Sequence, residues 1–148
     1  MMDINRSAPI ISTHEIVIRA SLERVWQLHT RIARWSEWNP DIVRAEPSRP
    51  AESGAECRWE TAGLVSSSFI GEEISLERVA WSGVSNGVTG VHVWTFTPHA
   101  DGVLVRTEES WEGDALPREH EDIQRALDDF LVGWLAHLKS LAESRSEI

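Results

Sequence analysis

Residues 90–113, GVHVWTFTPHADGVLVRTEESWEG, decide the fold of this chain, because they contain two strand-like segments joined by a turn. Side chains alternate between two faces along a strand. In the second segment one alternating set is mostly charged, so the other set is expected to face inward. The inward set is Val103, Val105, Thr107, Glu109 and Trp111, and the outward set is Leu104, Arg106, Glu108, Ser110 and Glu112. Glu109 is the one carboxyl group of the inward set.

The turns on either side of the first segment predict which residues lie opposite each other. A turn over residues 99–102 places His92 opposite Glu109. A hairpin turn over residues 85–88 places Trp81 opposite His92 in the same way. The sequence therefore predicts a row Trp81–His92–Glu109 across neighbouring strands. A register slip of one residue would put His92 and Glu109 on opposite faces.

A buried carboxyl group beside a buried imidazole is costly unless the two are paired. A paired carboxylate can fix the tautomer of an imidazole and raise its pKa, which is how a general acid or base is prepared. Three roles stay open for His92 and Glu109: a structural hydrogen bond, a polar anchor for a ligand, or a catalytic acid/base pair.

The segments around this hairpin predict an α+β layout in which all helices cover one face of an antiparallel sheet. Residues 10–20 are typical of a strand, and residues 21–39 show helical spacing with a break near 29–31. From Pro117 to about residue 144 an apolar stripe recurs at helical spacing, which predicts a long helix. Further strands are expected within 41–50, on both sides of a turn at 62–63 within 55–74, and at 77–84.

The composition excludes several classes of function. The chain has 148 residues and 14 basic against 24 acidic side chains, so it repels phosphate backbones and we expect no nucleic-acid partner. No apolar run is long enough to span a membrane, and the N-terminus lacks a signal pattern, so cytoplasmic residence is expected. The histidines and the single Cys57 show no metal-ligand spacing and no nucleotide-binding motif is present, so we expect no metal and no cofactor.

The aromatic content is unusual, with eight tryptophans, three phenylalanines and no tyrosine. Tryptophan is large and has one N–H group to satisfy. Two interpretations stay open: the rings provide bulk for a core, or several of them line a pocket for a flat, apolar molecule.

Segments along almost the whole chain, about residues 10–143, carry a family resemblance. The segments are VWQLHTRIARWSEWNPDI, GAECRWETAGLVSSS, RVAWSG, VHVWTF, DGVLVRTEESWEG and LVGWLAHLKSLAE. Together they resemble the polyketide cyclase/dehydrase and lipid-transport families of the START-like (SRPBCC) superfamily. The resemblance implies a helix-grip fold: a curved seven-stranded antiparallel sheet around a long C-terminal helix, two short helices after the first strand, and an internal cavity.

The same resemblance implies where the cavity walls come from, and two departures limit what it implies about chemistry. Aromatase/cyclases of this kind are thought to use cavity arginines with tyrosines, but this chain has no tyrosine, and Arg58 and Arg106 are expected to point outward. Hormone receptors of this fold use a strand lysine, but the only lysine here is Lys139 in the last helix. The expected ligand-binding residues are Trp35, Trp38, Trp59, Ser67, Phe69, Trp81, His92, Trp94, Glu109, Trp111, Phe130 and Trp134.

We therefore expect a single START-like domain over residues 1–148, with 1–8 and 145–148 loose, that binds a small hydrophobic molecule in a tryptophan-rich cavity. One alternative is a cofactor-independent cyclase or dehydratase in which His92 and Glu109 are catalytic. Another is a protein-interaction module whose cavity is vestigial. A homodimer stays open, and the sequence does not identify the ligand.

Overall fold

The elements of the computed structural model follow the order expected from the sequence. The structure describes residues 2–47, 55–61 and 64–144, without the side chains of residues 61 and 64–67. The bounds are β1 (Ile10–Ile18), α1 (Leu22–Thr30), η1 (Ile32–Arg34), α2 (Trp35–Trp38), β2 (Ile42–Pro47), β3 (Glu56–Thr61), β4 (Leu64–Ile74), β5 (Arg78–Ser85), β6 (Val88–His99), β7 (Gly102–Glu112) and α3 (Glu121–Glu143).

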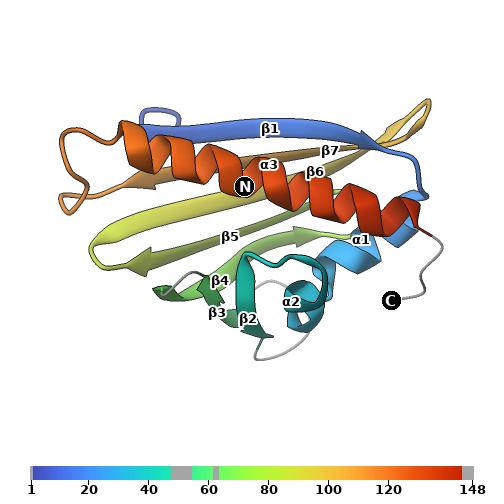
Figure 1. Cartoon of the computed structure of the whole chain (residues 1–148), viewed down its shortest axis with the longest axis horizontal. Helices are drawn as coiled ribbons and strands as arrows, with labels where there is room; N and C mark the ends of the chain where they lie inside the picture. Colours follow the sequence, from blue (N-terminus) through green and yellow to red (C-terminus); the bar gives the residue numbers. More distant parts are fainter. Residues whose placement is uncertain (1, 48–54, 62–63, 145–148) are drawn as a thin grey trace.

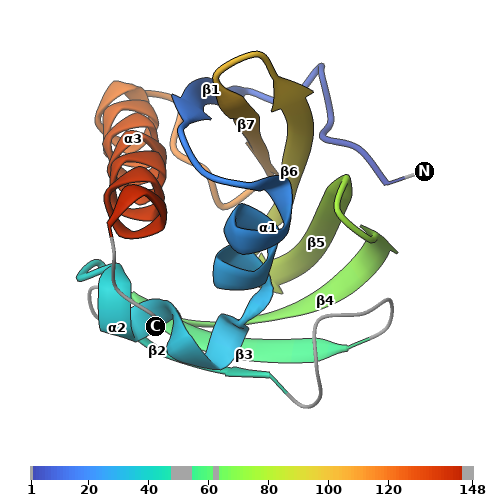
Figure 2. The same ribbon diagram turned by 90° about the vertical axis from the view of Figure 1, so that its right-hand side faces the viewer.

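The strands form one antiparallel seven-stranded sheet in the order β1-β7-β6-β5-β4-β3-β2. Long α3 runs along the inner face of this sheet (Figure 1). The sheet curls between its two ends, so that β1 and β2 lie on opposite sides of the interior, and α1 and α2 lie on the same side of the sheet as α3 (Figure 2). This is the helix-grip fold that the sequence predicts.

The short helices between β1 and β2 begin and end at residues with clear local reasons. Ser21 caps α1, because its hydroxyl accepts a hydrogen bond from the main-chain N–H of Arg24 at 3.2 Å. The helical path breaks at Arg31, inside the interval expected from the sequence. Asn39 leaves the helical region because Pro40 follows it. The break lets the segment bend over the inner face of the sheet.

The long helix starts four residues later than the sequence predicts. We expected it to start at Pro117, but α3 begins at Glu121, and its first main-chain bond runs from the N–H of Gln124 to His120. The preceding residues turn instead, with the N–H of Leu116 donating to the carbonyl of Gly113 at 3.1 Å. Pro117 directly follows this turn, and proline is as common beside turns as at a first helical position, so it did not mark the boundary.

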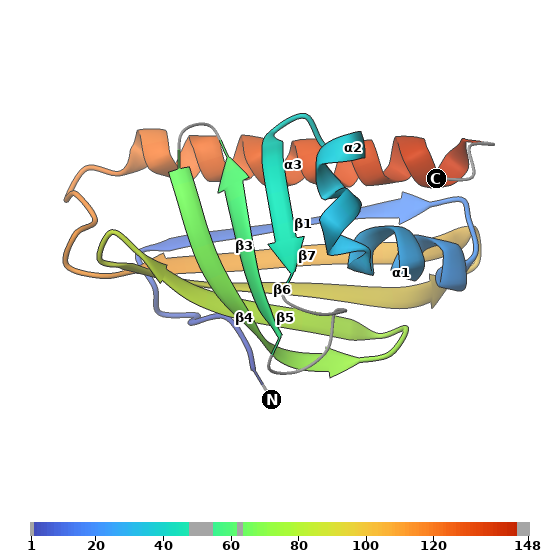
Figure 3. The same ribbon diagram turned by 90° about the horizontal axis from the view of Figure 1, so that it is seen from below.

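The N-terminal segment differs from the loose end that the sequence suggests. Residues 2–8 lie against the outer face of the sheet, on the side away from α3 (Figures 2 and 3). Ile4 is only 5% exposed and packs in a small cluster with Val93. The Arg6 guanidinium lies 2.7 Å from Glu108 of β7. Apolar contact and an ion pair therefore hold this segment, while residues 1 and 145–148 lie outside the described part of the chain.

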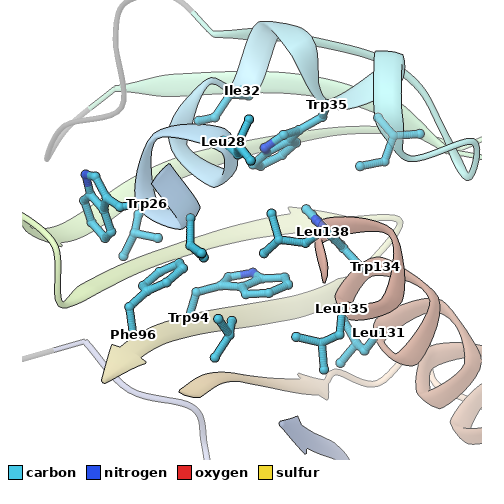
Figure 4. Packing of buried hydrophobic residues seen from close by; sticks show 14 of the residues in the cluster. Trp26, Leu28, Ile32, Trp35, Trp94, Phe96, Leu131, Trp134, Leu135 and Leu138 are labelled. Carbon is cyan, nitrogen blue, oxygen red and sulfur yellow. The ribbon is translucent and has the colours of Figure 1, made fainter. Parts of the chain in front are cut away.

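Tryptophan fills much of the interior between the sheet and the helices. Trp94 of β6 and Trp134 of α3 are fully buried, and Trp35 of α2 is 2% exposed. Figure 4 shows Trp94 between Phe96 and the side chains of α3, with Trp35 above it on the short helices. Burial of each ring removes a large apolar area from water, so these residues stabilise the fold as well as shape the interior.

Candidate functional site

The row predicted from the two hairpins is present. His92 pairs with Glu109 between β6 and β7, and Trp81 pairs with His92 between β5 and β6. The hairpins close more tightly than expected, since Ser85 pairs with Val88 and the loop shortens to two residues with positive φ. A loop that shortens by one residue on each side leaves the same residues opposite each other along the strands. The predicted register is therefore confirmed.

Both ring nitrogens of His92 lie close to oxygen atoms. Nδ1 is 2.8 Å from Oε1 of Glu109, although the approach is too oblique for a straight N–H···O hydrogen bond. Nε2 is 2.7 Å from Oγ1 of Thr107, a hydroxyl that can donate or accept. A carboxylate near Nδ1 favours the proton there, which leaves Nε2 to accept from Thr107. The imidazole is thus fixed in position with its side chain 2% exposed.

The polar row continues through β1 to the surface of α3. Ser12 pairs with Glu109, and its hydroxyl donates a hydrogen bond to Asp128. Nε2 of His14 lies 3.0 Å from the same Asp128 carboxylate. Burial acts to raise the pKa of Asp128, but hydrogen bonds from Ser12, His14 and Gln124 outweigh it and hold that pKa below its usual range. A line of polar side chains therefore leads from the interior to this helix.

His29 of α1 lies at the centre of the aromatic cluster. The centroid of its ring is 4.3 Å from that of Trp94. The ring also stacks on those of Trp81 and Trp134, with centroid distances of 6.1 Å and 6.2 Å. The side chain is buried, and neither ring nitrogen has a hydrogen-bond partner among the described residues. Burial, with a smaller contribution from His92, lowers the pKa of His29 well below its usual range, so the ring is neutral at neutral pH.

His29 was missed as a site residue in the sequence analysis, although a signal was present. It follows Val25 by four residues and Trp26 by three, and it precedes Ile32 by three, so it lies on the apolar stripe of the first helical segment. A histidine in the middle of an apolar stripe is itself an indication that the ring is buried. Trp26 was also left out of the predicted set, and it packs edge-to-face on Phe96 at 5.2 Å.

Four indoles of the interior differ in whether their N–H group has an acceptor. The N–H of Trp35 donates to the main-chain carbonyl of His29 at 2.6 Å, and the N–H of Trp59 donates to Oγ of Ser68 at 3.2 Å. The N–H groups of Trp94 and Trp134 are fully buried and have no acceptor among the described residues. Of these four indoles, two therefore have an acceptor for their N–H group and two have none in the described part of the chain.

A small cavity of about 10 Å³ adjoins this cluster. Such a volume is close to what a single water molecule requires, so the inner face is nearly filled by its own side chains. The lining residues are Ile32, Trp35, Cys57, Trp59, Ser68, Ile70 and Trp81. Burial raises the pKa of the Cys57 thiol to about 11, which makes this cysteine an unreactive wall of the cavity.

Most of the predicted ligand-binding residues come together in the interior. The rings of Trp35, Trp59, Trp81, Trp94 and Trp134 form one network with centroid distances of 5.0 to 6.4 Å. His92 joins this network through Trp81 and Trp134, and Phe130 joins it through Trp134. Trp38, Trp59, Trp111 and Phe130 are partly buried and pack against the main core.

Two predicted residues of β4 do not belong to this set. The prediction for Phe69 is wrong: its side chain is 53% exposed on the outer face, where it pairs across to Ser82. Its neighbours Ser68 and Ile70 are buried and face inward. The run of serines before Phe69 has no alternation of apolar and polar residues, so the inward face of this strand could not be read from the sequence. The side chain of Ser67 lies outside the described part of the chain.

Neither the two arginines expected to point outward nor the single lysine contributes a charge to the interior. Arg58 and Arg106 are exposed, as expected. The ammonium of Lys139 donates to the carbonyl of Val17 at 2.8 Å and also contacts Glu143. Within the described ranges no three His, Cys, Asp or Glu side chains could hold a metal ion together. No described helix is both long and apolar enough to cross a membrane.

A second, wider hollow lies on the surface at the start of α3. It has a volume of about 430 Å³ and is open to solvent. The residues that line it are His120, Glu121, Gln124, Arg125 and Asp128. None of these is a tryptophan or an aliphatic residue, so the hollow lacks the apolar walls of a site for a hydrophobic molecule.

Solved structures confirm the fold over almost the whole chain. A hypothetical protein, jhp0584, from Helicobacter pylori superimposes with a TM-score of 0.81 at 17% identity, covering 97% of this chain and 98% of that one. A START superfamily protein from Mycobacterium smegmatis gives 0.77 at 13% identity, covering 90% and 97%. The di-domain ARO/CYC StfQ from the steffimycin biosynthetic pathway gives 0.79 at 14% identity, covering 94% of this chain and 52% of StfQ.

At these identities the structural likeness shows the fold alone. No curated protein matches the chain. The family model described as polyketide cyclase / dehydrase and lipid transport matches residues 9–143, which is nearly the entire chain. The protein therefore belongs to the polyketide cyclase/dehydrase and lipid transport family.

Proposed function

We propose that this protein binds a small hydrophobic molecule on the inner face of its sheet, between α3 and the α1–α2 segment. The observation that carries the proposal is the convergence of tryptophan rings from five elements into one cluster, three of which, Trp35, Trp59 and Trp81, line the cavity. Trp134 of α3 lies 5.0 Å from Trp35 of α2 and 5.1 Å from Trp94 of β6, as centroid distances. Some of these flat rings meet edge-to-face and others are tilted against each other. Together they provide surfaces on which an aromatic or other apolar molecule can stack.

A ligand must widen the cavity, because about 10 Å³ is far below the volume of an organic molecule. The wall suited to this movement is the short, interrupted helical segment that carries Trp35. Its 3₁₀ turn and four-residue α2 make few internal hydrogen bonds, so a shift of this segment costs less than a shift of a β-strand. The partly buried Trp59 provides a second side chain that can rotate.

The proposal is tested with tetralin, a bicyclic hydrocarbon, titrated into the ¹⁵N-labelled protein. Binding in the interior is expected to shift the signals of residues that line the cavity. Ile70→Phe adds bulk to the cavity wall and is expected to weaken binding about tenfold or more, because overpacking forces side chains off their rotamers. Val84→Phe is the matched control, since Val84 is 67% exposed on the neighbouring strand.

Two results would contradict the proposal. Equal weakening by Ile70→Phe and Val84→Phe would show that the ligand does not enter this cavity. No binding to the folded protein would favour the interaction module, an alternative that the small cavity volume supports.

A catalytic role is a second candidate, favoured by the 2.8 Å approach of His92 Nδ1 to Glu109 Oε1. In a cyclase or dehydratase of this kind, His92 would move a proton and Glu109 would stabilise the charged imidazole. Nε2 is engaged with Thr107, so a substrate oxygen would have to replace that hydroxyl. Glu109→Gln keeps the shape of the side chain; retained ligand binding with lost turnover would identify the pair as catalytic.

A further inference from the structure

Three side chains from three different elements bring unused hydrogen-bonding groups to one place. They are His29 of α1, Trp94 of β6 and Trp134 of α3, and each is at most 1% exposed. Four nitrogen atoms, two on His29 and one on each indole, have no partner in the described part of the chain. Buried polar groups are nearly always satisfied in folded proteins, so a cluster of four needs a specific explanation.

The cluster is not explained by a general difficulty in placing an acceptor next to a buried indole. The nearby Trp35 and Trp59 both find an acceptor, one on the main chain and one on Ser68. The fold can therefore satisfy an indole in this environment. Trp94 and Trp134 are in ring contact with each other at 5.1 Å, and His29 contacts both. The unused groups are thus gathered in one cluster and not spread through the core.

The cluster adjoins the cavity of the proposed binding site. Trp35 and Trp81 line that cavity, and their rings lie 5.9 Å and 6.1 Å from the ring of His29. The same two indoles contact Trp134 at 5.0 Å and 6.3 Å. A molecule that widens the cavity past these two rings therefore comes close to the side chains that carry the unused nitrogen atoms.

The charges around the cluster restrict what such a molecule can carry. Glu109 places a carboxyl group on the inner face, and His29 is neutral at neutral pH because it is buried. No Arg or Lys side chain among the described residues offers a positive charge to this interior: Arg58 and Arg106 are exposed, and Lys139 is engaged near the end of α3. An anion would be stripped of water beside a carboxyl group with no cation to compensate.

We infer that His29, Trp94 and Trp134 form the polar anchor of the binding site, and that its ligand is an uncharged apolar molecule with a hydrogen-bond-accepting oxygen, as in a ketone. The two indole N–H groups can donate to the two lone pairs of one carbonyl oxygen. The neutral imidazole adds one donor and one acceptor. This inference rests on the proposed function and selects, within hydrophobic molecules, against fatty acids and other anions.

The test compares three probes of nearly equal shape: tetralin, its ketone α-tetralone, and tetralin carboxylate. Each is titrated into the ¹⁵N-labelled protein, and the indole N–H signals report on hydrogen bonding. We expect α-tetralone to bind about tenfold more tightly than tetralin, and tetralin carboxylate at least tenfold more weakly. The indole N–H signals of Trp94 and Trp134 are expected to move downfield with the ketone and not with the hydrocarbon.

Two variants separate the anchor from general packing. His29→Phe keeps an aromatic ring at the centre of the cluster and removes both nitrogens. It is expected to abolish the preference for α-tetralone over tetralin while tetralin still binds. Trp26→Phe is the matched control, because Trp26 is a buried ring that contacts Phe96 outside the anchor, and it should leave the preference unchanged.

The outcomes distinguish failure of the inference from failure of the proposed function. Equal binding of tetralin and α-tetralone, with unmoved indole signals, would overturn the anchor and leave hydrophobic binding intact. Tightest binding of the carboxylate would overturn the charge selectivity. No binding of any probe to the folded protein would overturn both the proposed function and this inference. The comparison of probes uses the unmodified protein, so it stands even if a variant does not fold.

Discussion

Nδ1 of His92 lies 2.8 Å from Oε1 of Glu109 across β6 and β7, with both side chains less than 10% exposed. On the other side of the ring, Nε2 contacts the Thr107 hydroxyl. An imidazole held at both nitrogens cannot rotate without losing one contact. We therefore expect the pair to stabilise the centre of the inner face, whether or not it also acts on a ligand.

We expect loss of either contact to destabilise the fold. Glu109→Gln and Thr107→Val should each lower the free energy of unfolding by about 1–3 kcal/mol, because the first removes the negative charge beside Nδ1 of His92 and the second leaves the buried Nε2 without its hydroxyl partner. Urea denaturation followed by circular dichroism measures the change. Glu119→Gln is the control, since Glu119 is exposed. Changes no larger than that of the control would show that the pair does not stabilise the fold.

The buried His29 predicts a dependence of stability on pH. Its pKa in the folded protein lies well below the usual value of 6.5, so below pH 6.5 the unfolded chain binds a proton that the folded chain does not. Stability is fully present above that pH and falls as the pH decreases, by up to about 1.4 kcal/mol per pH unit. His29→Phe should reduce this slope between pH 6.5 and 5, measured by urea denaturation at a series of pH values.

The control for this slope is His99→Phe at an exposed position of the β6–β7 hairpin. It should keep the slope of the unmodified protein. Asp128 does not interfere, because a lowered carboxyl pKa loses its stabilising contribution only at pH values below its usual 3.8. An unchanged slope in His29→Phe would show that His29 is not the group that is kept neutral by folding.

The N-terminal segment should contribute to stability through Ile4. Ile4→Ala removes a side chain that is 5% exposed in the small outer cluster, so it should cost about 2–4 kcal/mol. Ile74→Ala is the control, because Ile74 is 39% exposed. Thermal denaturation compares the two variants, and equal melting temperatures would indicate that residues 2–8 are not held against the sheet.

Much of the fold could be predicted because the deciding signals are local. Alternation in the β6–β7 hairpin gives the inward face, and turn signals give the register that brings His92 to Glu109. These signals require only neighbouring residues. The Pro117 boundary failed because proline suits both a turn and a first helical position. Phe69 failed because the serine-rich strand before it has no readable alternation.

The rest of the site depends on contacts that no local pattern encodes. His29 and Trp134 are more than a hundred residues apart in sequence, and only the curl of the sheet and the path of α3 bring their rings to 6.2 Å. Side-chain geometry also decides whether a buried indole finds an acceptor. Trp35 has one, whereas Trp94 has none among the described residues. The small cavity is likewise the result of packing among several elements.

The measurement that most directly tests hydrophobic binding in the interior is a set of intermolecular nuclear Overhauser effects between bound tetralin and the protein. We predict contacts from tetralin protons to the indole protons of Trp35, Trp59 and Trp81, which line the cavity. Contacts only to Gln124 and Arg125, which line the surface hollow at α3, would contradict the account. Such a result would place the ligand outside the tryptophan cluster and leave the cluster as a core alone.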